Sequence, residues 1–137
     1  MTGKHSDLRS KLGRARGLGS AHDGVSHWWL QRVTAVALIP LSLWFVYALM
    51  TVMLAPSVAH VAQWFLSPLN TIVTILLLIT TFIHAKLGLQ VVIEDYVHSP
   101  SMKYTLLLAN LFTCFIFAAI SILAVLKLHL LDVSGGV

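Results

Sequence analysis

The stretch "PLNTIVTILLLITTFIHAKLGLQVVIEDY", Pro68 to Tyr96, decides the fold. A helix needs about 20 residues to cross the roughly 30 Å of hydrocarbon in a bilayer, and this stretch is longer than that. Two other apolar runs, residues 33–59 and 104–126, contain no charged side chain at all. The sequence therefore predicts an all-α membrane protein with three transmembrane helices.

The composition excludes a soluble domain of this length. Hydrophobic residues make up 58% of the 137 residues, charged residues only 10%, and the mean hydropathy is +0.86. A soluble protein would need more polar surface to cover its core. The net charge of +4 comes mostly from a basic N-terminal segment without interleaved aromatic residues, which argues against nucleic-acid binding. The single cysteine, Cys114, can form no disulfide within the chain.

Turn and capping residues give the expected boundaries. We expect helices at about 27–53, 68–94 and 102–130. Ser67 is a candidate N-cap ahead of Pro68, and Pro100 is expected to break the chain before a third helix that Ser99 or Ser101 could cap. Residues 1–22 form a polar, basic arm, and residues 23–137 form the membrane anchor domain.

The distribution of lysine and arginine predicts the orientation. The first connection has no such residue and the second has Lys103, whereas six precede or open the first span: Lys4, Arg9, Lys11, Arg14, Arg16 and Arg32. The positive-inside rule places the N-terminus and the second connection inside, and the C-terminus outside. Because the arm lacks a clear amphipathic, serine-rich presequence, we expect a bacterial inner membrane, with the mitochondrial inner membrane as the alternative.

Ionisable groups gather at the end of the decisive stretch. At 100° and 1.5 Å per residue, Asp95 lies about 16 Å along the helix from His84 and within about 20° of the same face. Gly88 lies at about 40° from His84 on that face. Lys86 points away from it and is expected to snorkel or to meet a neighbouring subunit. His84, Gly88 and Asp95 therefore form one stripe along the helix, and Tyr96 lies just beyond its end.

An intramembrane histidine such as His84 has three interpretations. It can be a hydrogen-bonded packing residue, part of a proton or ion pathway, or a metal ligand, in which case haem iron is the commonest metal. Gly88 favours haem, because a flat macrocycle needs a backbone without a side chain one turn from its ligand. The chain has no second histidine at matching depth, so a second axial ligand must come from another subunit.

The polar residues at the inner boundary also allow two interpretations. Asp95 and Tyr96 are ordinary interface residues by composition, but together they can hydrogen-bond a quinone and help to protonate its carbonyl oxygen. Arg32 either snorkels to the interface or binds an anionic ligand such as a haem propionate, which a guanidinium holds in bidentate fashion.

In these residues the sequence resembles the small, haem b-binding membrane-anchor subunit of succinate dehydrogenase, respiratory complex II. The second helix of that family carries a haem-ligand histidine, a glycine four residues later, and an aspartate–tyrosine pair eleven and twelve residues later. His84, Gly88, Asp95 and Tyr96 match this spacing. The first helix of the family opens with a glycine-containing turn, followed by an arginine and, two and three residues on, threonine and alanine. That pattern is matched by Gly24, Arg32, Thr34 and Ala35.

The resemblance implies a role for each matched residue. His84 would be one axial ligand of haem b, the other coming from the larger cytochrome b anchor subunit. Tyr96 would hydrogen-bond ubiquinone with Asp95 behind it, and Arg32 would contact a haem propionate. Succinate oxidation would belong to a flavoprotein subunit and an iron–sulfur subunit on the inner side, because this chain has no dinucleotide fingerprint and no cysteine cluster.

Other functions stay open on the sequence alone. A purely structural anchor would hold a soluble dehydrogenase to the membrane without a redox role. A fumarate reductase anchor would work in the opposite direction with menaquinol. A small transporter subunit fits least well, since only one span carries ionisable groups in its interior.

Overall fold

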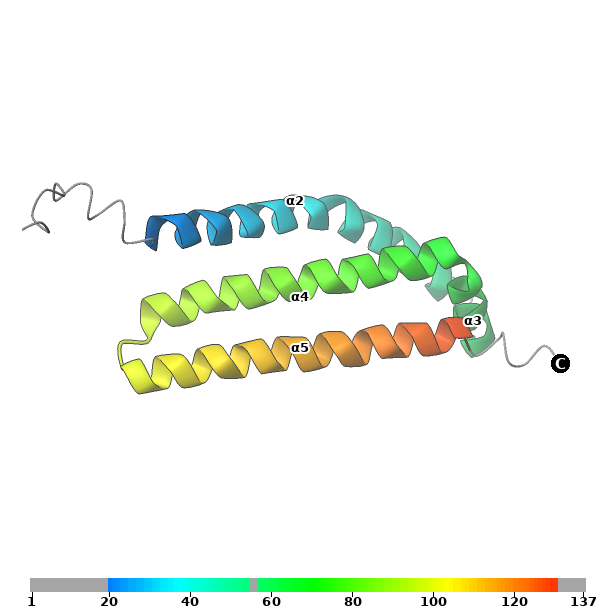
Figure 1. Ribbon diagram of the computed structural model, residues 1–137. Helices are drawn as coiled ribbons and strands as arrows, with labels where there is room; N and C mark the ends of the chain where they lie inside the picture. Colours follow the sequence, from blue (N-terminus) through cyan, green and yellow to red (C-terminus); the bar gives the residue numbers. More distant parts are fainter. Residues whose placement is uncertain (1–19, 55–56, 131–137) are drawn as a thin grey trace, which may run out of the picture.

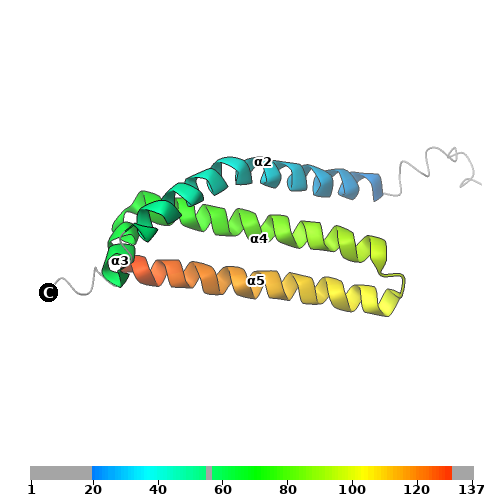
Figure 2. The same cartoon turned by 180° about the vertical axis from the view of Figure 1, so that it is seen from behind.

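Three long helices lie side by side in one layer, and a short helix crosses one end (Figure 1). The computed structural model describes residues 20–54 and 57–130, without the side chains of residues 20–24 and 58. The elements are α2 (Ser20–Met53), α3 (Val58–Leu66), α4 (Pro68–Tyr96) and α5 (Pro100–Leu130). Helix α4 lies between α2 and α5 and contacts both, as the opposite views agree (Figures 1 and 2).

The three predicted spans are confirmed. Val25–Met53, Pro68–Tyr96 and Pro100–Leu130 are each long and apolar enough to cross a membrane. Only four hydrophobic side chains are buried among the described residues, and most large apolar side chains are exposed. A helix that is apolar all round needs lipid or another protein against it, so the fold is an all-α membrane protein that buries little by itself.

The first helix starts earlier than the sequence predicted. It begins at Ser20 rather than near His27, so it includes the last residues of the predicted arm, and Gly24 is helical instead of part of a turn. One glycine costs a helix about 1 kcal/mol relative to alanine, which a long helix tolerates once it has formed. Residues 1–19 of the predicted arm lie outside the described residues.

The ends of the other spans follow from their backbone hydrogen bonds. Helix α4 continues to Tyr96, two residues further than expected, and the Val97 amide then donates to the Ile93 carbonyl at 3.0 Å. Pro100 begins α5 instead of breaking the chain ahead of it, because proline needs no amide partner at the first helical position. Ser67 occupies the N-cap position of α4, but its side chain makes no capping hydrogen bond.

Helix α3 occupies most of the first connection and was not predicted from the sequence. The Ser57 hydroxyl accepts a hydrogen bond from the His60 amide at 3.1 Å and caps its start. Near its end, the Phe65 carbonyl accepts hydrogen bonds from Thr71 Oγ1 at 2.8 Å and His129 Nδ1 at 2.7 Å. These donors satisfy a carbonyl that a helix end leaves without an internal partner, and they tie α3 to both α4 and α5.

Helix α2 contains Pro40, and its second half bends toward α4 (Figure 1). A proline inside a helix removes one backbone hydrogen bond and usually causes a kink. Past this point the Trp44 ring lies 5.4 Å from the Trp64 ring of α3, centroid to centroid. The bend therefore brings the second half of α2 onto α3.

Asn110 joins α5 to α4 in the middle of the spans. Its side chain is only 6% exposed, and Nδ2 donates to the Lys86 carbonyl at 3.0 Å. The Cys114 thiol lies 3.5 Å from Asn110 Oδ1. An amide away from water needs such partners, so this contact fixes the position of α5 along α4.

We expect Asn110→Leu to weaken the α4–α5 contact by about 1 kcal/mol, the usual size of an interhelical hydrogen bond in a membrane. The thermal unfolding midpoint of the detergent-solubilised protein in its native assembly should fall. Thr113→Val is the matched control, because Thr113 is exposed on the same helix. Equal midpoints for the two variants would contradict the assigned role of Asn110.

Candidate functional site

His84 is half-buried on α4 and faces α2. Its Nδ1 atom lies 3.0 Å from the hydroxyl of Thr34, a residue that is only 6% exposed. The two helices run antiparallel, so the first half of α2 lies beside the second half of α4 (Figure 1). The predicted site histidine is therefore held by a hydrogen bond with the neighbouring helix.

The hydroxyl geometry favours a proton on Nδ1 of His84. Thr34 Oγ1 lies 2.9 Å from the Leu30 carbonyl and 3.0 Å from the Gln31 carbonyl, and a carbonyl can only accept. If the single hydroxyl proton goes to one of these carbonyls of α2, all three contacts are satisfied when the hydroxyl oxygen accepts from His84 Nδ1–H. In this tautomer the lone pair of the imidazole is on Nε2, and Nε2 makes no hydrogen bond to any described residue.

A hollow of about 340 Å³ lies beside the imidazole. It is lined by Trp28, Gln31, Arg32, Ala35 and His84. The Arg32 guanidinium carbon lies 5.3 Å from the centre of the Trp28 ring, a distance at which a cation is attracted to the ring face. The hollow thus places one available imidazole nitrogen and one cation next to each other, which suits a ligand with a metal and a carboxylate.

Gly88 lies one turn from His84 and also faces α2. A Cβ atom built there would have Gln31 Nε2 as its nearest neighbour, at 4.0 Å. The sequence analysis did not single out Gln31, although it is a polar residue three positions before Thr34 and therefore on the same helix face. The spacing of three residues from Thr34 is the sequence feature that could have identified Gln31.

Asp95 and Tyr96 lie apart from the hollow. Both belong to the last turn of α4 and are exposed, Tyr96 to 78%. Neither side chain makes a hydrogen bond to another described residue. The helical rise puts them about 16 to 18 Å from His84 along the axis. His84 therefore lines the hollow, whereas Asp95 and Tyr96 lie at the exposed end of α4.

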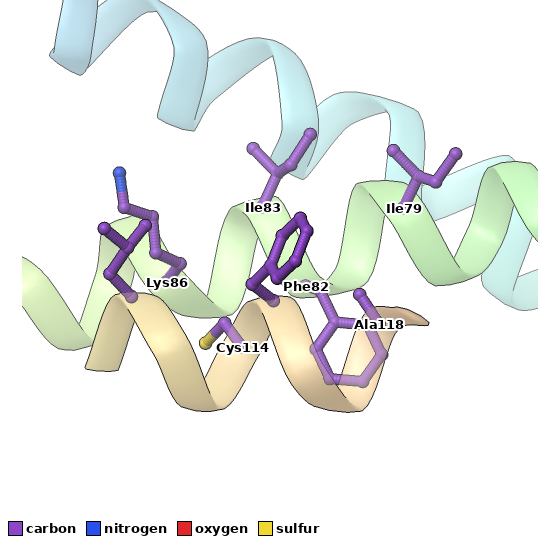
Figure 3. Close-up of a pocket in the computed structure, with 8 residues that line it drawn as sticks. Ile79, Phe82, Ile83, Lys86, Cys114 and Ala118 are labelled. Atoms are coloured by element: carbon purple, nitrogen blue, oxygen red, sulfur yellow. The ribbon is translucent and has the colours of Figure 1, made fainter. Parts of the chain in front are cut away.

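Lys86 lies on the other side of α4, as its spacing from His84 predicted. It lines an apolar groove of about 310 Å³ between α4 and α5 (Figure 3). The other lining residues are Ile79, Phe82, Ile83, Leu111, Cys114, Phe115 and Ala118. Within residues 20–54 and 57–130, no three histidine, cysteine, aspartate or glutamate side chains come together, so the hollow offers a single protein nitrogen to a metal.

A known protein family matches most of the chain. The profile of the succinate dehydrogenase/fumarate reductase transmembrane subunit family matches residues 6–118. The chain belongs to this family. No solved structure matches the chain significantly.

Curated relatives agree with the family. The succinate dehydrogenase hydrophobic membrane anchor subunit of Rickettsia bellii is 40% identical over 104 residues, which cover 75% of this chain and 82% of the relative. The subunit of the same name from Rickettsia conorii is 32% identical over 111 residues, 80% and 87% of the two chains. That of Paracoccus denitrificans is 30% identical over 105 residues, 77% and 81%.

The resemblance drawn from the sequence is thereby confirmed at the level of the family. The chain is a membrane-anchor subunit of succinate dehydrogenase, an oxidoreductase, and it works with the other subunits of that complex. The relatives from Rickettsia and Paracoccus are bacterial, which supports the predicted bacterial inner membrane.

The anchor subunit should tolerate Gly88→Ala, because the added Cβ would meet Gln31 only at ordinary contact distance. Gly88→Leu should push α2 away from α4 and cost about 1 to 3 kcal/mol, the usual range for overpacking. Thermal denaturation of the purified complex measures both. Ala85→Leu, at an exposed position of the same helix, is the control, and equal stability of the two leucine variants would show that α2 does not pack over Gly88.

Proposed function

We propose that this anchor subunit binds haem b through His84 Nε2. The observation that carries the proposal is the hydrogen bond between Thr34 and His84 Nδ1, because it leaves Nε2 as the available nitrogen beside the hollow. Arg32, at the edge of the same hollow, is exposed and makes no ion pair with the described residues, so its guanidinium is available for a propionate. Bound haem supplies reversible one-electron chemistry.

A second axial ligand would come from the larger cytochrome b anchor subunit. The hollow contains one histidine, and the other described histidines lie nearer the ends of the helices: His27, His60, His98 and His129. The hollow is also formed by only two helices, so a partner helix has to complete it. This requirement fits the small buried core and the large exposed apolar surface of the chain.

The exposed end of α4 would form part of the ubiquinone-reduction site. The Tyr96 phenol can donate a hydrogen bond to a quinone carbonyl, and Asp95, the preceding residue, can supply a proton or orient the ring. Conversion of ubiquinone to quinol takes two electrons and two protons. In this proposal the electrons derive from succinate oxidation in the flavoprotein subunit and arrive through the iron–sulfur subunit.

The proposed orientation puts this end of the bundle in the cytoplasm. The first residues of α2 and the connection between α4 and α5 lie at the same end, opposite α3 (Figure 1). Lys103, at that connection, donates to the Glu94 carbonyl at 2.8 Å. The positive-inside rule therefore places Asp95 and Tyr96 on the side where the soluble subunits would dock.

His84→Leu should remove haem b from the purified complex, because leucine offers no nitrogen to the iron. The reduced-minus-oxidised absorption spectrum measures the haem, and subunit composition confirms assembly. His98→Leu, an exposed histidine of the inner connection, should keep the spectrum. A haem b spectrum retained in assembled His84→Leu would refute the haem half of the proposal.

Tyr96→Phe and Asp95→Leu should each lower quinone reduction at least about tenfold, as expected for groups that hydrogen-bond and protonate the substrate. Succinate oxidation with a soluble electron acceptor should be unchanged. Tyr104→Phe is the matched control, because Tyr104 is exposed to 73% near the same end of the bundle. Normal quinone turnover in assembled variants would favour a purely structural anchor.

A further inference from the structure

We propose that Thr34 is the positioning residue for His84: its hydroxyl holds the imidazole in the Nδ1–H tautomer and fixes the ring orientation, so that Nε2 points to a metal. This inference rests on the proposed haem function and assigns a role to a residue of the first span. It stands on the 3.0 Å contact between Thr34 Oγ1 and His84 Nδ1 and on the burial of Thr34.

The contact differs from what three other threonine hydroxyls within the spans do. Thr51, Thr74 and Thr80 each donate to a carbonyl of their own helix, and none has a further partner. This is the usual way in which threonine satisfies its hydroxyl in a membrane helix. Thr34 makes the same bond and in addition meets a side chain fifty residues away. Its hydroxyl therefore also contacts a side chain of another helix, beyond the bond within its own helix.

The second contact between a threonine and a histidine has another explanation. Thr71 Oγ1 lies 3.3 Å from His129 Nδ1, but that nitrogen is closer to the Phe65 carbonyl, at 2.7 Å. The N–H of His129 is thus used to cap α3. At His84 no backbone carbonyl competes for Nδ1–H, and the Thr34 oxygen is the acceptor among the described residues.

An acceptor on the far nitrogen of an iron-bound imidazole has a measurable effect. It increases electron donation from the ligating nitrogen, which stabilises the ferric form relative to the ferrous form. Loss of the acceptor should therefore raise the midpoint potential of the haem. We expect the equilibrium ratio of ferric to ferrous haem at a given potential to fall about threefold to tenfold. A tenfold change in this ratio corresponds to a shift of about 59 mV in the midpoint potential of a one-electron couple.

The experiment compares three variants of the purified complex with the unmodified complex. Thr34→Val keeps the side-chain shape and removes the hydroxyl, Thr34→Ser restores the hydroxyl, and Thr80→Val removes a hydroxyl that is equally buried but bonded only to Leu76. A spectroelectrochemical titration gives the midpoint potential, and the absorption spectrum gives the haem content. We expect a higher potential in Thr34→Val alone.

Each other result has a defined reading. An unchanged potential in Thr34→Val with haem bound would overturn the positioning role and leave haem binding intact. Loss of haem from assembled Thr34→Val, with haem restored in Thr34→Ser, would support the positioning role and would show that haem binding itself needs the hydroxyl. If Thr34→Val prevents assembly while Thr80→Val does not, Thr34 is structural and the inference fails. Absence of haem from the unmodified complex would refute the proposed function itself.

Discussion

A polar group within an apolar span has no water to bind, so it must find its partner inside the protein. Helix α4 meets this constraint on both sides. On one side His84 bonds to Thr34 of α2, and on the other the Lys86 carbonyl accepts from Asn110 of α5. These two contacts lie within one turn of each other and fix α4 between its neighbours. The positions of the hollow and the groove both follow from them.

The two sides of α4 differ in chemistry. Toward α2, an imidazole and a guanidinium border the hollow. Toward α5, the groove is apolar apart from Lys86, which makes no hydrogen bond through its amine to a described residue. A helix rotates 100° per residue, so two positions, 84 and 86, are enough to place these surfaces on opposite sides. The redox site that we propose occupies only the first of them.

The sequence was enough for the three spans, because length and the absence of charge identify them without tertiary information. It also placed His84, Gly88 and Asp95 relative to one another, since all three belong to one helix. Thr34 could be matched to a family pattern but not given a role, because the register between two helices is not encoded in the spacing along either. Helix α3 was missed because nine residues between two spans look like a connection unless the capping bonds of Ser57 and Thr71 are known.

Helix α4 runs without interruption from Pro68 to Tyr96 and has no proline after its first residue. The segment between His84 and Asp95 is therefore a rigid spacer that fixes the distance and the rotation between the hollow at His84 and the exposed end of α4. One residue inserted there would lengthen it by only about 1.5 Å but would turn Asp95 by about 100° relative to His84. An insertion would preserve the shared face only in steps of about 7 or 11 residues, and these would move the end of the helix by about 10 Å or more. The segment can change its side chains but not its number of residues.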